Sequence, residues 1–169
     1  MLFRNGERVL PFDLNPFEEL HDLRMLLETT AAHRPCESDL KALPAVLDEL
    51  AATWLVSPSQ RSSDSVQVAQ WDESFHCTPV AAAGNAEMAR VHRDVTERIR
   101  VIRRPDFTKQ PRMDVTYREY GEILKAIQRK RGNQAALLLR AHIQTSQTEL
   151  RKITLHQVHL ARQMGGAAG

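Results

Sequence analysis

The sequence contains little cysteine, few aromatic residues and no long apolar run. Its only two cysteines are Cys36 and Cys77, and they do not form a CxxC arrangement. Neither a thiolate metal cage nor a disulfide framework is indicated, so we expect a protein of the reducing cytoplasm. No segment has the apolar length needed to cross a bilayer, and the first residues, MLFRNGERVL, lack the apolar centre of a signal peptide. We therefore expect no membrane partner.

A strongly one-sided net charge is also missing, but the two halves of the chain differ. Residues 1–85 carry 6 Lys/Arg and 13 Asp/Glu, a net charge of −7, whereas residues 86–169 carry 17 and 8, a net charge of +9. This asymmetry could orient partners or subunits, or it could reflect solvated helix faces of opposite sign. The densest basic runs, RVIRR and QRKRG, contain no aromatic residue to stack on bases, so they are a weak indication of nucleic-acid binding.

Segments with strand periodicity and internal repeats are absent, and helical periodicity fills the chain. At 169 residues the chain has the size of one domain. The predicted helices cover residues 16–33, with Asn15 as N-cap, 39–56 with an interruption at Pro44, 65–83 with a bend at Pro79, 86–103, 113–131 and 133–162. The predicted fold is all-α: an antiparallel bundle of about six to seven helices with a central polar cavity for a ligand or metal.

Four of the predicted apolar helix faces contain a polar residue. Arg24 lies on the first face, Asp72 and His76 on the third, Tyr120 on the fifth and His142 on the sixth. Burying an isolated charge costs several kcal/mol, so such groups are normally paired or bound to a ligand. Together these residues indicate a polar cavity inside the bundle, which is a recurrent place for ligand and metal sites.

Asp72 and His76 are separated by one helical turn, so both side chains can reach a single cation. A carboxylate and an imidazole suit Zn, Mn, Ni or Fe(II). The same pair also fits a buried hydrogen bond that closes the core. His142 alone fits a core histidine with satisfied hydrogen bonds, and Arg24 alone fits a side chain that extends to the end of the bundle.

Three segments, DESFHCTPVAAAGN, REYGEILKAI and LLLRAHIQ, together resemble the C-terminal effector-binding (FCD) domain of FadR-like, GntR-type bacterial transcription regulators. ELHDLRMLLE is similar to the first helix of that domain, so the resemblance covers about residues 16 to 160. It implies a linker at 1–15, an effector-binding and dimerisation domain at 16–162 and a disordered tail at 163–169.

The resemblance also implies a divalent metal, Zn, Ni or Mn, on Asp72, His76 and His142. A further histidine of the family would fall at position 120, where this chain has Tyr120. A neutral phenol is a poor ligand for these ions. We therefore expect three good ligands and a reduced metal affinity, with Tyr120 as a hydrogen-bonding neighbour.

Members of the family sense small carboxylates, sugar acids or acyl derivatives, and we expect an effector of this kind. Arg24 suits a carboxylate because its guanidinium can bind both oxygens. Tyr120 and Asn85 are the other effector-binding candidates, although Asn85 also fits a helix cap. The resemblance implies a homodimer. It also implies that DNA is contacted only through a winged helix-turn-helix domain, for which the fifteen residues before the first helix are too short.

Two other functions fit the same residues. One is a metal-dependent enzyme on a helical bundle that uses a metal-bound water as nucleophile. The predicted site offers no spare carboxylate on the same face to act as general base, so we assign no catalytic residue. The other is an oligomerisation domain with a satisfied polar core, which would bind neither metal nor ligand.

Overall fold

The computed structural model describes residues 15–37, 43–103 and 110–166. Within these ranges the chain forms six α-helices and one short 3-10 helix and contains no strand, which confirms the predicted all-α class. The elements are α1 (Asn15–Glu37), α2 (Leu43–Trp54), η1 (Pro58–Gln60), α3 (Ser65–Ala82), α4 (Ala86–Arg103), α5 (Gln110–Gln128) and α6 (Gly132–Gly166).

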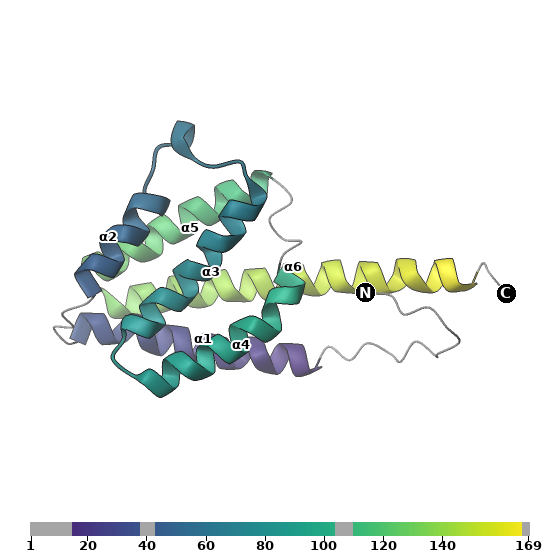
Figure 1. Ribbon diagram of the computed structural model, residues 1–169, viewed down its shortest axis with the longest axis horizontal. Coiled ribbons are helices and arrows are strands. Elements are labelled where there is room, and N and C mark those ends of the chain that lie inside the picture. Colours follow the sequence, from purple (N-terminus) through teal and green to yellow (C-terminus); the bar gives the residue numbers. More distant parts are fainter. Residues whose placement is uncertain (1–14, 38–42, 104–109, 167–169) are drawn as a thin grey trace.

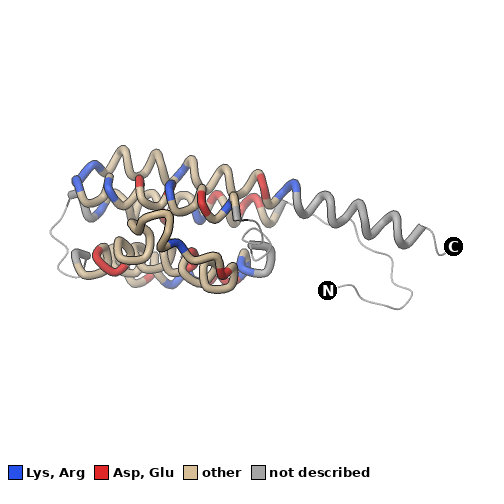
Figure 2. Tube along the Cα trace, turned by 90° about the horizontal axis from the view of Figure 1, so that it is seen from above, with Lys and Arg blue, Asp and Glu red and all other residues tan. Residues whose placement is uncertain are grey.

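The helices form a bundle in which α1 packs against α6, α4, α3 and α5. Helices α1 and α6 lie side by side, and α6 extends past the other helices (Figure 1). Helix α5 packs against α6 and α2, while α3 packs against α4, α1 and α2. Acidic and basic residues are interspersed along the helices rather than gathered at one end of the bundle (Figure 2). This distribution fits solvated helix faces better than a molecule with two oppositely charged halves.

The junction between α3 and α4 follows the prediction. Gly84 has a φ of 74°, a left-handed conformation that glycine adopts without steric cost. The side chain of Asn85 then accepts a hydrogen bond of 3.0 Å from the backbone N–H of Met88, which caps the start of α4. Helix α3 begins in the same way, because the Asp64 carboxylate accepts the backbone N–H groups of Val66 and Gln67. Local sequence therefore fixes both helix starts.

Several predicted boundaries are wrong. Helix α2 begins at Leu43, so Pro44 lies in its first turn, where the missing N–H interrupts no helical hydrogen bond. Helix α5 begins at Gln110 rather than at residue 113. Helix α6 runs from Gly132 to Gly166 rather than from residue 133 to 162. The domain bounds, with a linker at 1–15 and a tail at 163–169, stay predictions, and residues 1–14 and 167–169 lie outside the described residues. Pro79 lies inside α3, as predicted.

The apolar core lies mainly among α2, α3, α5 and α6. Trp54, at the end of α2, is its centre: the ring centroids of Tyr120 and Tyr117 lie 4.6 and 4.8 Å away, and that of Phe75 lies 6.1 Å away. Among the described residues, no helix is long and apolar enough to span a membrane.

Candidate functional site

The hydroxyl group of Tyr120 on α5 lies at the centre of a buried polar cluster. It donates a hydrogen bond to Asp72 Oδ1, and its oxygen lies 2.7 Å from His76 Nε2 and 3.2 Å from His142 Nε2. The phenol ring stacks on Phe75, with the ring centroids 3.6 Å apart. Tyr120 is 0% exposed. One side chain therefore belongs to the apolar core through its ring and to the polar cluster through its oxygen.

Each imidazole of the cluster is oriented by a second carboxylate. His76 Nδ1 lies 2.6 Å from Glu28 Oε2, and His142 Nδ1 lies 2.7 Å from Glu119 Oε2. A carboxylate on one ring nitrogen fixes the orientation of the ring and directs the other nitrogen. Both Nε2 atoms are thereby aimed at the oxygen of Tyr120.

Glu28 on α1 connects the cluster to a further group on α4. Its Oε1 accepts a hydrogen bond of 2.7 Å from Arg24 Nε and lies 2.9 Å from His92 Nε2. Burial raises the pKa of Glu28, but the Arg24 guanidinium and the imidazoles of His76 and His92 hold it well below its usual value. Glu28 is therefore a buried carboxylate that stays ionised at neutral pH.

His92 and His142 differ in charge. Burial lowers the pKa of His92, but the thiol of Cys77 and the carboxylate of Glu28 together raise it to about 9, so His92 is cationic at pH 7. Burial also lowers the pKa of His142, and the carboxylates of Glu119 and Asp72 do not reverse this, so His142 is neutral. Glu119 has a lowered pKa: burial raises it, but His142 and Arg112 outweigh burial.

The structure brings the three predicted metal ligands together. Asp72, His76 and His142 each offer one ligand atom, and these atoms lie within 4.8 Å of one another. One carboxylate and two imidazoles could hold a divalent cation. The point at which they converge, however, is taken by the oxygen of Tyr120. In this structure the three ligand atoms therefore surround a hydroxyl oxygen.

Arg24, the predicted effector-binding residue, lies next to the cluster. It is 0% exposed, and its Nε is paired with Glu28. Within the described part of the chain, its two other nitrogens, Nη1 and Nη2, are buried without a hydrogen-bond partner. Buried guanidinium donors normally have partners, because leaving them unpaired costs free energy. The unpaired edge of Arg24 therefore fits an anionic ligand.

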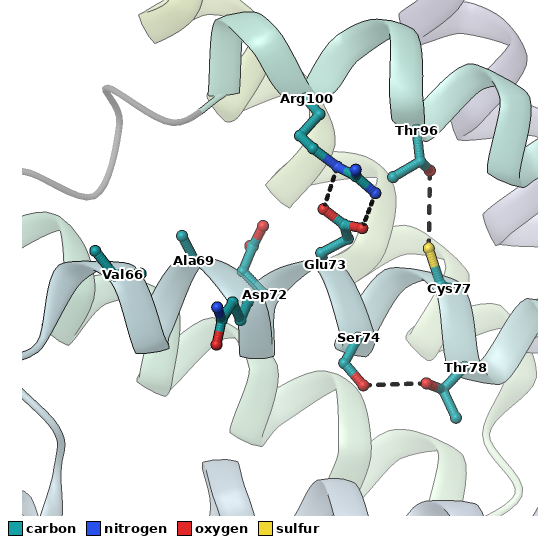
Figure 3. Close-up of a pocket in the computed structure, with 10 residues that line it drawn as sticks. Val66, Ala69, Asp72, Glu73, Ser74, Cys77, Thr78, Thr96 and Arg100 are labelled. Carbon is teal, nitrogen blue, oxygen red and sulfur yellow. Dashed lines mark hydrogen bonds and ion pairs between the residues drawn. The ribbon is translucent and has the colours of Figure 1, made fainter.

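The predicted central cavity for a ligand or metal is not seen in the described residues, where a buried polar cluster lies instead. The space beside Glu28 and His76 measures about 20 Å³, which is room for one water molecule. A much larger pocket, of about 700 Å³, lies between α3 and α4 (Figure 3). Asp72 lines this pocket, so the pocket adjoins the polar cluster, and Glu73 pairs with Arg100 across it.

The register between α1 and α4 places Arg24 level with a residue that lines this pocket. Helices α1 and α4 run in opposite directions, because Glu28 contacts His92 while an apolar cluster joins the start of α1 to the later turns of α4. Arg24 lies one turn before Glu28, and Thr96 lies one turn after His92. Arg24 is thus level with Thr96, which is buried and lines the pocket.

Sequence reasoning missed Glu28, His92 and Glu119. His92 lies on one helical face with Met88, Val95 and Ile99, which are all buried. Its position on this apolar stripe of α4 would have predicted that His92 is buried. Glu28 follows Arg24 by one turn, which marks it as a possible partner of that arginine. Glu119 is partly exposed, and no sequence pattern singles it out.

Asn85 has a clear structural role as the cap of α4. It does not line either the small cavity or the large pocket described above. A role for Asn85 in effector binding stays a prediction.

The chain matches the family model of the FCD domain over residues 19–145. This match covers well over half of the chain and contains every residue of the polar cluster, from Arg24 to His142. Comparison with curated proteins gave no match.

Proposed function

We propose that this chain, which belongs to the FCD domain family, is the effector-sensing part of a GntR-type bacterial transcription regulator. FCD domains are ligand-sensing regulatory domains, and the match spans the cluster described above. The observation that carries the proposal is the guanidinium of Arg24, which is fully buried with two nitrogens unpaired. A protein interior retains such a group when a ligand satisfies it.

The effector is a small carboxylate or sugar acid. The two Nη atoms of Arg24 form a planar pair of donors that matches the two oxygens of a carboxylate. Its third nitrogen, Nε, is already used by Glu28, which holds the guanidinium in place. A neutral ligand would leave the positive charge of the unpaired edge without compensation.

The effector enters through the pocket between α3 and α4. Its volume of about 700 Å³ suits a small organic molecule, whereas the 20 Å³ cavity does not. The ion pair of Glu73 and Arg100 spans the pocket, and both side chains are partly exposed (Figure 3). Exposed ion pairs contribute little stability, so separating this one costs little. Arg100 would then be free to attract the acid toward Thr96 and Arg24.

Effector binding regulates the protein through the position of α1. Glu28 connects α1 to both α3 and α4, so a ligand on Arg24 changes contacts between three helices at once. A ligand shifts a conformational equilibrium by its difference in affinity for the two states. The regulator acts as a homodimer on DNA through a winged helix-turn-helix domain, and the FCD domain has a regulatory rather than a catalytic role.

Calorimetric titration with small monocarboxylates, dicarboxylates and sugar acids, each matched by its amide, tests this function. At least one acid should bind, and its amide should not. Arg24→Gln should weaken binding by about 100-fold, the effect of losing a charge-assisted bidentate contact. Arg24→Lys keeps the charge but loses the planar fork and should also bind poorly. Arg90→Gln, which changes an exposed arginine of α4, is the matched control and should bind normally.

Two results would contradict the proposal. The first is that no acid binds the wild-type protein. The second is that an acid binds with the same affinity to wild type and to a folded Arg24→Gln variant, since the acid would then use another site.

A further inference from the structure

We propose that the hydroxyl group of Tyr120 replaces the divalent cation in this chain: its oxygen occupies the point at which Asp72, His76 and His142 converge, and so excludes Zn, Ni and Mn. The inference concerns what holds the cluster together. It goes beyond the proposed sensing of an acid and does not depend on it, because metal content is measured without any effector.

The distances within the cluster are those of hydrogen bonds. Imidazole nitrogens lie roughly 2.0–2.1 Å from a bound zinc ion. Here His76 Nε2 and His142 Nε2 lie 2.7 and 3.2 Å from the oxygen of Tyr120, which itself hydrogen-bonds to Asp72. An ion cannot share this point with the oxygen. The phenol would become a good fourth ligand only as phenolate, and its ordinary pKa is about 10.

Packing prevents the phenol from moving aside. Its ring stacks on Phe75, with an angle of 2° between the planes, and meets Trp54 edge-on at a centroid distance of 4.6 Å. The side chain is 0% exposed. Because protein cores are close-packed, turning the ring away would leave a void beside Trp54 and create a clash elsewhere. The oxygen is therefore a fixed part of the cluster.

The carboxylates that orient His76 and His142 already have cationic partners. Glu28 pairs with Arg24 and His92, and Glu119 pairs with Arg112. A divalent cation at the convergence point would therefore add two positive charges next to a single remaining carboxylate, that of Asp72, which is unfavourable at low dielectric.

A single substitution should convert this cluster into a metal site. Histidine is shorter than tyrosine by about the length of a metal–nitrogen bond, roughly 2 Å. In Tyr120→His the convergence point is vacated, and a new imidazole nitrogen faces it from α5. The ion would then have one carboxylate and three imidazoles as ligands, a set that suits Zn, Ni or Mn.

The experiment measures the metal content of untagged protein by mass spectrometry after dialysis against Zn²⁺, Ni²⁺ or Mn²⁺ and gel filtration. Wild type should carry only traces of metal, and a chelator should leave its melting temperature unchanged. Tyr120→His should carry about one ion per chain, lost again in Tyr120→His with Asp72→Ala. Tyr117→His is the matched control: it places a histidine one turn earlier on α5, outside the cluster, and should gain no ion.

Stoichiometric metal in wild type that disappears in His76→Ala would overturn the proposal. A folded Tyr120→His protein that stays metal-free would overturn it too, because Tyr120 would then not be what keeps the ion out. If circular dichroism shows that Tyr120→His does not fold, the wild-type measurement decides alone: absence of bound metal and of any chelator effect supports the proposal, and bound metal refutes it.

Discussion

Tyr120 joins two regions that are held together differently: the apolar core around Trp54, which packs against its ring, and the polar cluster around its hydroxyl group. The core is held by packing between aromatic and aliphatic side chains, and none of these side chains needs one particular neighbour. The cluster is a network in which each group needs a specific neighbour, since Glu28 alone serves Arg24, His76 and His92. Stability of the core should follow the volume that is filled, whereas stability of the cluster should follow charge and pH.

The largest effect is expected in the core. Trp54→Ala removes the side chain around which four aromatic rings pack and should lower the free energy of unfolding by about 4 kcal/mol. Urea unfolding at several pH values checks this. Because no titratable group is changed, the loss of stability should be the same at every pH. A loss that varies with pH would show that the stability of the core also depends on charge.

In the cluster, Glu28→Gln should cost about 3 kcal/mol at neutral pH, because it leaves Arg24, His76 and His92 facing a neutral amide. The folded-state pKa of Glu28 is depressed, so its contribution is present above its ordinary pKa of 4.5 and is lost as the pH falls through the depressed value. The difference between variant and wild type should therefore shrink in acid. Glu19→Gln, an exposed change on the same helix, should have little effect at any pH.

His92 gives the cluster a second pH dependence, on the alkaline side. Its pKa is raised from 6.5 to about 9 in the folded protein, so its contribution is full below pH 6.5 and is lost as the pH rises through 9. The free energy of unfolding should fall by about 3 kcal/mol over this range. His92→Gln should flatten the curve when wild type and variant are compared by urea unfolding. An unchanged slope would show that His92 is not the group responsible.

The smallest effect is expected outside both regions, at the cap of α4. Asn85→Ala removes the acceptor for the N–H of Met88 and should cost about 1 kcal/mol. Thermal unfolding measures this loss, and titration with an effector measures binding. We expect binding to be unchanged; a large loss of affinity would instead establish the role in effector binding that the sequence predicts for Asn85.

The sequence predicts the helices and the inner polar residues because both depend on local periodicity. Asp72, His76, Tyr120 and His142 each interrupt an apolar stripe, and the structure brings all four into one cluster. Glu28 was not predicted because an acid one turn from Arg24 is equally typical of an exposed helix face.

The size of the interior space could not be predicted either. It depends on how closely α1, α3 and α5 approach one another, and no single segment encodes that distance. Asp72, His76, Tyr120 and His142, which suggested a ligand cavity, instead contact one another, and the space beside His76 measures about 20 Å³. The larger pocket lies between α3 and α4 and is lined by Asp72.

The hydrogen-bonded cluster has a mechanical consequence. Its members come from five helices: Glu28 from α1, His76 from α3, His92 from α4, Tyr120 from α5 and His142 from α6. Helix α2 contributes only apolar contacts to its neighbours among the described residues. The five connected helices can therefore tilt about this common point but cannot slide along one another without breaking buried bonds. Rotation about a fixed pivot, rather than translation, is the motion that the architecture permits at least cost.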